Sequence, residues 1–332
     1  MATPNTLRKP HIVELLPRDG LQTMVHESAW TPPTTAQKVE FIRRAAAAGV
    51  PEIEITGFVH PKVIPQLADA EEVARQTAGM SGVVLRALVP NLRGAMRAFD
   101  AGMRKVSCLV VASETYQRKN SNMSIEENKQ DIERIVDLAR RDGHAVDVGM
   151  GICFLCPYEG PVPAQRILGL VDYFVALGID EISIADSIGH AGPAEVAERV
   201  DMILQKHPHL KLGLHLHDMS GMAIANVYAG WQAGATSFEA CTGGYGGGIA
   251  MPVSVNGMGN VPTEDVVNMF HTIGADTGVD LAVLRAAGEW FAGVIGVPSR
   301  ARVARNGTYD DLLAIGRRLL QEQAATSMKE SA

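Results

Sequence analysis

The feature that most constrains the fold is a regular alternation of short apolar runs with segments of helical length. Eight apolar runs bounded by turn residues are predicted to be strands, at residues 11–16, 52–57, 83–89, 105–111, 146–154, 181–185, 211–217 and 236–241. Segments with helical spacing separate them, at residues 35–48, 68–78, 92–101, 124–141, 164–177, 194–206 and 222–233. Several of these segments end in a glycine directly before the next strand, as in AAAAGV and VALGID.

Eight strand and helix repeats predict a parallel sheet of the α/β class that is covered by helices. The count of eight favours a (β/α)8 TIM barrel with extra C-terminal helices, and a doubly wound open sheet is the alternative. We expect residues 1–332 to form a single domain, with the barrel in about 10–275 and the added helices in about 280–323. The last residues, AATSMKESA, are expected to fray.

Composition and charge narrow the range of partners. The chain is 46% hydrophobic, carries a net charge of -7 and mixes acidic with basic residues along its length. This pattern argues against a nucleic-acid or anionic-membrane surface, although a local basic site could still bind an anionic small molecule. The start of the chain has no apolar core like that of a signal peptide, and no run reaches the length of a membrane span, so we expect a cytoplasmic location.

Four cysteines in a chain of this length are expected to be reduced thiols. Cys153 and Cys156 form a C-x-x-C pair. No second pair exists to complete a zinc site, and Pro157 follows directly, so we expect this pair to be structural.

Several residues that could carry chemistry follow predicted strands. Catalytic groups in such a barrel come from the C-terminal ends of the strands and the loops after them. Arg18 and Asp19 follow the first strand, Glu54 lies on the second, and Asp186 ends the sixth. An ordinary Arg-Asp-Gly turn is the structural alternative for the first of these positions.

The seventh strand, LGLHLHD, places His215 and His217 two residues apart. Side chains alternate along a strand, so both imidazoles face the same side and could meet Asp19 across the barrel mouth. Two imidazoles and a carboxylate predict a divalent-metal site, with donors that suit magnesium, manganese or zinc. Two histidines satisfied within the core are the alternative.

A glycine-dense run, CTGGYGGGIAMPVSVNGMGN, follows the eighth strand at residues 241–260. This segment, called the glycine loop below, could cradle a phosphate or close as a lid over the barrel mouth. A plain surface connection is the alternative, but long glycine-rich loops at this place are more often functional.

Eight motifs in order, between about residues 11 and 265, carry a family resemblance. They are PRDGLQ, IEITGFVHPKVIPQLAD, VPNLRGA, SETYQRKNSNMSIEEN, CPYEG, ISIADSIG, HLHDMSGMAIAN and GNVPTED. Together they resemble the 3-hydroxy-3-methylglutaryl-CoA (HMG-CoA) lyase family of metal-dependent lyases and synthases. The resemblance implies a TIM barrel, an acyl-CoA thioester substrate, a Mg²⁺ or Mn²⁺ cofactor with Zn²⁺ as a further candidate, and a homodimer.

The resemblance also assigns roles to individual residues. The ligands of the divalent cation would be Asp19, His215, His217 and Asn260. Arg18 would stabilise the thioester enolate, and Asp186 would move the proton of the substrate hydroxyl. The residues that position these groups would be Glu54, Gln22 and Glu264. The contacts with the CoA thioester would come from Lys119 and Asn120, together with the CPYEG loop.

The implied reaction is a retro-Claisen cleavage that ends when an acid protonates the departing acyl-CoA enolate. In the family, a cysteine in a Gly-Gly-Cys-Pro loop is credited with that proton. Here the position falls on Gly248 or on Met251 before Pro252, and neither residue can move a proton. Cys241 is a weak substitute candidate, because it lies earlier, within the predicted strand.

Two histidines stand where the family has other residues. FVHPK places His60 after the second strand, and DSIGHAG places His190 four residues after Asp186. Each could be an ordinary solvated loop histidine. The hypothesis is a family member with altered substrate specificity, in which one of these histidines takes part in substrate recognition or proton transfer.

Two other functions are retained as alternatives. One is a synthase that condenses an acyl-CoA with a 2-keto acid; such relatives generally carry a long additional C-terminal portion, whereas little beyond two helices follows this barrel. The other is a catalytically degenerate protein that binds metal and acyl-CoA without turnover, which the intact set of metal ligands disfavours.

Overall fold

Eight parallel strands close into a barrel in the computed structural model, which describes residues 7–250 and 259–330. The strands are β1 (His11–Glu14), β2 (Glu52–Gly57), β3 (Val84–Val89), β4 (Lys105–Val111), β5 (Ala145–Gly151), β8 (Glu181–Asp186), β9 (Lys211–Leu216) and β10 (Ser237–Ala240). Each pairs with the next along the chain, and β10 pairs with β1 to close the sheet. The predicted barrel is therefore confirmed, and the open sheet is excluded.

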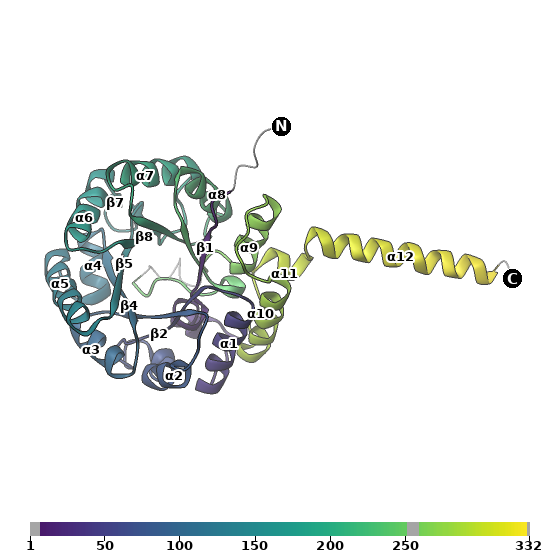
Figure 1. Ribbon diagram of the computed structural model, residues 1–332, viewed down its shortest axis with the longest axis horizontal. Helices are drawn as coiled ribbons and strands as arrows, with labels where there is room; N and C mark the ends of the chain where they lie inside the picture. Colours follow the sequence, from purple (N-terminus) through teal and green to yellow (C-terminus); the bar gives the residue numbers. More distant parts are fainter. Residues whose placement is uncertain (1–6, 251–258, 331–332) are drawn as a thin grey trace.

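Seven helices that follow successive strands ring the barrel (Figure 1). They are α1 (Thr35–Ala47), α2 (Ala70–Thr77), α3 (Leu92–Asp100), α5 (Ile125–Asp142), α6 (Ala164–Ala176), α7 (Pro193–Lys206) and α8 (Ala223–Ala233). Local capping explains where several begin: the Thr34 and Ser124 side chains each accept a hydrogen bond from the backbone three residues on, at the starts of α1 and α5.

The loops after β4 and β5 contain structure that the sequence pattern did not predict. Helix α4 (Glu114–Ser121) begins at Ser113, whose hydroxyl accepts the Tyr116 backbone N–H. The loop after β5 forms a small hairpin, β6 (Leu155–Cys156) and β7 (Gly160–Pro161). Both elements lie on the side of the barrel where the strands end.

Four helices follow the barrel: α9 (Thr263–Thr272), α10 (Leu281–Ile295), α11 (Arg302–Asn306) and α12 (Tyr309–Glu330). Helix α10 packs on α1, with the Phe41 and Phe291 rings 5.1 Å apart, whereas α12 extends away from the barrel (Figure 1). The expectation that the chain frays from residue 324 was wrong as far as Glu330, because no glycine or proline stops the helix in QEQAATSMKE. Within the described residues, no helix combines the length and the apolar character needed to cross a bilayer.

The barrel interior is unusual because buried and half-buried charged side chains pair with one another there, whereas such barrels are mostly filled by branched apolar residues. The paired residues are Glu52, Glu54, Arg86, Lys105, Asp147, Glu181 and Glu239. The apolar core lies instead between the strands and the surrounding helices, around residues such as Ile53 and Phe174. The polar interior continues into the mouth of the barrel, where the candidate site lies.

All four cysteines are buried and free. Cys153 Sγ donates to the carbonyl of Met150 at 2.9 Å, and Cys156 Sγ lies 3.0 Å from the Ser113 hydroxyl. The two thiols therefore have separate partners, as expected for a structural C-x-x-C pair.

Candidate active site

The turn after β1 brings Arg18 and Asp19 to the barrel mouth. The chain leaves the strand through a π-helical turn, η1 (Leu16–Gly20), a geometry that recurs at functional sites. The carboxylate of Glu14 stabilises this turn by accepting the Leu16 N–H at 2.8 Å, and it also accepts the Thr242 N–H at 2.8 Å. One buried side chain thus ties the turn to the start of the glycine loop.

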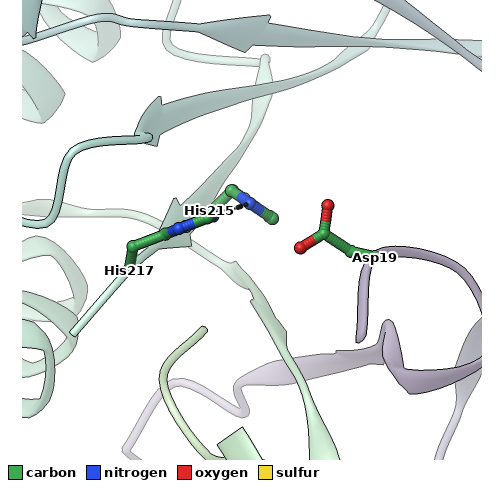
Figure 2. Close-up of side chains that lie close together, drawn as sticks. All are labelled: Asp19, His215 and His217. Atoms are coloured by element: carbon green, nitrogen blue, oxygen red, sulfur yellow. Dashed lines mark hydrogen bonds between the residues drawn. The ribbon is translucent and has the colours of Figure 1, made fainter. Parts of the chain in front are cut away.

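His215, His217 and Asp19 converge as predicted from the strand alternation. Figure 2 shows the two imidazoles, at the end of β9, facing the Asp19 carboxylate. The His215 and His217 Nε2 atoms are 3.0 Å apart, and one potential ligand atom from each of the three residues lies within 4.8 Å of the others. Burial, reinforced by the neighbouring His215, lowers the pKa of His217 to about 4, so this imidazole is neutral at neutral pH and can donate a lone pair.

Asn260 lies beside this group because it forms an isolated antiparallel backbone bridge with His217. Its Nδ2 atom donates to Asp19 Oδ2 at 2.6 Å and to the Tyr245 carbonyl at 2.9 Å. Its Oδ1 atom is buried and has no hydrogen-bond partner. A buried hydrogen-bond acceptor without a partner destabilises the folded state, so we expect this oxygen to bind a ligand.

The four residues Asp19, His215, His217 and Asn260, called the ligand group below, fit a divalent cation. They offer two imidazole nitrogens and two oxygens. Adjacent ligands of an octahedral ion with bonds of about 2.1 Å lie about 3.0 Å apart, which matches the separation of the two Nε2 atoms. Burial alone would raise the pKa of Asp19, but the Arg18 guanidinium, together with the hydrogen bond from Asn260, holds it below its usual value, so the carboxylate is ionised.

Arg18 is held by two carboxylates beside the ligand group. Its Nε atom donates to Glu54 Oε1 and one of its terminal nitrogens donates to Asp19 Oδ1. Gln22 Nε2 also donates to Asp19 Oδ1, at 2.6 Å, and to the Gly247 carbonyl at 2.7 Å. Glu54 and Gln22 therefore lie where the positioning roles implied by the resemblance require them.

Two residues that sequence reasoning missed complete these contacts. Glu239 Oε2 lies 3.0 Å from His215 Nδ1, and Arg86 donates to Glu239 Oε1 at 2.6 Å. Both are single charged residues within apolar strands, and that contrast was the available signal. Strand register brings Glu239 to His215, because the two residues are directly opposite each other on β10 and β9.

Asp186 is turned away from the ligand group. Its two carboxylate oxygens accept the backbone N–H groups of Gly189 and Ala191, both at 2.9 Å, and its side chain is not among those lining the cavity described below. Strand alternation explains this placement, because the preceding Ala185 faces the cavity. Burial raises the pKa of Asp186.

Glu264 lies behind the glycine loop and does not touch the ligand group. Both its carboxylate oxygens accept the Gly243 N–H, at 3.0 and 3.1 Å. Burial raises the pKa of Glu264 to about 8. Glu264 therefore anchors the start of the loop rather than a metal ligand.

A cavity of about 500 Å³ opens beside the ligand group. The sequence-predicted site residues that line it are Arg18, Asp19, Gln22, Glu54, His60, Lys119, Asn120, His215 and His217. Tyr116 and Cys108, which the sequence analysis did not single out, also line it. This volume is within the range of small-molecule sites.

The two family-atypical histidines are placed differently. His60 lines the cavity, and its Nδ1 accepts the Lys62 N–H at 3.1 Å. Both residues are exposed, but His190, with Nδ1 3.2 Å from the Gly189 carbonyl, is not among the described residues that line the cavity.

The structure describes one of the two positions in the glycine loop at which the family's cysteine could align. Gly248 lines the cavity, whereas Met251 and Pro252 lie outside the described residues. Cys241 is buried, contacts the Thr242 carbonyl at 3.4 Å and does not line the cavity. Burial raises the pKa of its thiol well above the usual value, so the structure does not support this thiol as the substitute acid.

The CPYEG loop meets the glycine loop over the cavity. The Tyr158 hydroxyl donates to the Ala250 carbonyl at 2.8 Å, and Lys119 Nζ lies 4.9 Å from the centre of the Tyr158 ring. The Lys119 ammonium group therefore lies at the cavity rim, where it could bind an anionic ligand.

Comparison with known families agrees with this geometry. A model of the HMGL-like family matches residues 9–290, most of the chain. The chain belongs to the HMGL-like family.

Named relatives of this HMGL-like protein are lyases. It is 38% identical to the (R)-citramalyl-CoA lyase of Chloroflexus aurantiacus, over 89% of this chain and 94% of that one. The solved HMG-CoA lyase of Bacillus subtilis is 36% identical with a TM-score of 0.84, covering 92% of this chain and 99% of that one. An HMG-CoA lyase from Acinetobacter baumannii, solved with coenzyme A and 3-methylmalate, is 31% identical with a TM-score of 0.85, covering 94% and 98%.

Proposed function

We propose that this HMGL-like protein is a divalent-metal-dependent carbon-carbon lyase that cleaves a 3-hydroxyacyl-CoA resembling HMG-CoA. The products are an acyl-CoA such as acetyl-CoA and a keto acid or ketone. The observation that carries the proposal is the unpartnered Asn260 Oδ1 beside Asp19 and the two imidazoles, at the edge of a cavity of about 500 Å³. The lyase names of the relatives support the same activity.

The ligand group would hold the cation, with Mg²⁺ or Mn²⁺ suited to its oxygens and Zn²⁺ to its imidazoles. When bound, the cation would supply Lewis-acid chemistry that lowers the pKa of the substrate hydroxyl. His217 can act as a ligand of the cation because its imidazole is neutral at neutral pH.

Arg18 would bind the thioester oxygen as negative charge develops on it. Its Nε atom is engaged by Glu54 and one terminal nitrogen by Asp19. These contacts hold the guanidinium at the cavity wall before substrate arrives. Lys119 and Asn120, further along the same cavity, would bind the CoA portion of the thioester.

We propose that His60 takes part in protonating the enolate, because this residue lines the cavity. The placement of Asp186 favours a different role from the proton transfer implied by the resemblance. Its carboxylate orders the loop between β8 and α7. His190, on the surface of that loop, is the less favoured of the two histidines.

A panel of 3-hydroxyacyl-CoA thioesters tests the function and the altered specificity together. Purified protein is incubated with Mg²⁺ or Mn²⁺ and each thioester, including HMG-CoA and citramalyl-CoA, and products are identified by mass spectrometry. Metal-dependent appearance of an acyl-CoA and a keto product supports the lyase. Cleavage of HMG-CoA alone, at rates unaffected by His60→Ala and His190→Ala, would contradict altered specificity.

The two alternative functions, a condensing synthase and a degenerate binding protein, predict different assay results. Release of free CoA from acetyl-CoA and a 2-keto acid would identify a condensing synthase. Tight thioester binding with no turnover across the panel would identify a degenerate binding protein.

The proposal also covers the oligomeric state of the protein and its location in the cell. We propose a homodimer, supported by apolar side chains that α12 exposes, including Leu312, Leu319 and Leu320. Light scattering on the purified protein tests it. The cytoplasmic location stays a prediction, to be checked by cell fractionation.

A further inference from the structure

Arg86 lies at the centre of the charged barrel interior. It is on β3, its side chain is 3% exposed, and its nitrogens reach two carboxylates on opposite sides. Nε donates to Glu54 Oε2 at 3.0 Å, and a terminal nitrogen donates to Glu239 Oε1 at 2.6 Å.

Each of these carboxylates uses its other oxygen to hold a site residue. Glu54 Oε1 accepts the Nε hydrogen of Arg18, and Glu239 Oε2 lies 3.0 Å from His215 Nδ1. A continuous line of alternating charges therefore runs from the proposed enolate-binding guanidinium, through Arg86, to the metal-ligand imidazole. Arg18 also contacts the ligand group directly through Asp19, and Arg86 adds a second connection between the two halves of the site, through the carboxylates of Glu54 and Glu239.

The energetics make Arg86 hard to replace in this position. Buried carboxylates are stable only when paired, and removal of one partner leaves an uncompensated charge. The guanidinium is planar, permanently charged and offers donors in several directions, so it can bind two carboxylates at once. A lysine ammonium carries the same charge but lacks this fork.

Two further acids approach Arg86 more loosely. Its other terminal nitrogen lies 3.7 Å from Asp147 Oδ1 and 3.8 Å from Glu52 Oε1. Lys105 is already paired with Glu52 at 2.8 Å. Glu52 and Asp147 therefore have Lys105 as a second cation. Glu54 has Arg18 as its second cation, and Glu239 has the His215 imidazole as its second partner.

We propose that Arg86 is a positioning residue that orients Arg18 through Glu54 and His215 through Glu239, so that enolate stabilisation and metal binding depend on one side chain. Arg86 fixes the Glu239 carboxylate, which in turn fixes the tautomer and ring orientation of His215. The part that concerns Arg18 rests on the proposed lyase activity, whereas the part that concerns metal affinity rests only on the proposed binding of a cation by the ligand group.

The experiment compares Arg86→Met and Arg86→Lys with the wild type. A matched control is Arg199→Met, which removes another buried guanidinium, one that donates to the Cys153 and Val162 carbonyls. Electron paramagnetic resonance of free Mn²⁺ gives the dissociation constant of each purified protein, and circular dichroism and the melting temperature report folding. We expect Arg86→Met to weaken Mn²⁺ binding by roughly 10- to 100-fold, Arg86→Lys to recover part of the loss, and Arg199→Met to leave it unchanged.

Steady-state kinetics on the thioester that the wild type cleaves give the second readout. Because Arg18 acts on the developing enolate, we expect kcat of Arg86→Met to fall more than KM rises, at saturating Mn²⁺. A folded Arg86→Met protein with wild-type Mn²⁺ affinity and kcat would overturn the inference.

A double-mutant cycle keeps the test usable if Arg86→Met fails to fold. Mn²⁺ affinity is then measured for Arg86→Lys, Glu239→Gln and the double variant. Losses that are clearly less than additive support a path through Glu239, and strictly additive losses contradict it. If the wild type binds Mn²⁺ and Arg86→Met does not, but no thioester is cleaved, the proposed function fails while the metal-positioning role of Arg86 stands.

Discussion

Nδ1 of His215 lies 3.0 Å from Oε2 of Glu239, directly across the strand pair that joins β9 to β10. This contact leaves Nε2 of His215 facing His217 and the Asp19 carboxylate (Figure 2). A carboxylate on the far nitrogen raises the basicity of a ligating imidazole and fixes its orientation. The barrel wall thus fixes the arrangement of the ligand group.

Asn260 is predicted to contribute an oxygen ligand. Asn260→Ala removes the unpartnered Oδ1 and the hydrogen bond to Asp19, and we expect Mn²⁺ affinity to fall by at least roughly 10-fold. Isothermal titration calorimetry measures the change. Asn226→Ala is the control, because that buried amide donates to the Ala191 carbonyl away from the cavity; an equal loss in both variants would argue against ligation.

Gly246 is predicted to be irreplaceable at the point where the glycine loop meets the ligand group. Its φ is +99°, and a Cβ there would lie 2.6 Å from the Asp19 carbonyl and 2.7 Å from Asn260 Nδ2. The strain and displacement, of order 1–3 kcal/mol, should reduce Mn²⁺ affinity by roughly 10-fold or more in Gly246→Ala. Gly169→Ala, on α6 with open space around it, should bind Mn²⁺ normally. Normal binding by both variants would show that the loop yields.

Glu264 is predicted to make the metal-free protein less stable as pH rises. Its folded-state pKa is raised by burial from 4.5 to about 8, so the folded protein binds more protons than the unfolded chain between these values. The free energy of unfolding should therefore fall as pH increases from about 5 to 8. Urea denaturation at several pH values, with EDTA present, measures this slope.

Glu264→Gln should make that slope less steep, because an amide can still accept the Gly243 N–H but does not titrate. Glu198→Gln on exposed α7 surface is the control and should keep the wild-type slope. Identical slopes in all three proteins would rule out Glu264 as the source.

His60 and His190 are predicted to separate in their effects. His60 lines the cavity, so His60→Ala should lower kcat/KM by roughly 10- to 100-fold on the preferred thioester. His190 does not line the cavity, so His190→Ala should stay within about twofold of wild type. Kinetics with the substrate identified from the thioester panel decide this, and the opposite ranking would move the acid to the loop after β8.

The barrel itself was predictable because its signals are local. Each strand is an apolar run of suitable length, and helices such as α5 carry a side-chain cap at the start and a glycine at the end. Helix α4 was missed because its sequence, ETYQRKNS, is polar and has no apolar periodicity. The approach of His215 and His217 was predictable for the same local reason, since strand side chains alternate.

The orientation of single residues at strand ends depended on the three-dimensional structure. Asp186 and Asp19 both follow an apolar strand in a chemically suggestive motif, yet one carboxylate caps a loop and the other joins the ligand group. The difference comes from the phase in which each chain segment leaves its strand. The π-helical turn after β1 shifts that phase, and sequence periodicity does not record it.

The sequence by itself determined the eight-stranded barrel, the candidate metal-ligand residue types and the family motifs, because hydrophobic periodicity and donor chemistry are properties of short segments. Only the tertiary structure decided that Arg86 and Glu239 stand behind the site and that Asn260 presents a free oxygen to it. These relationships join residues as far apart as β3 and β10, which strand register and barrel closure bring into contact. Buried charges are stable only where such distant partners meet, so their pairing is a property of the folded barrel.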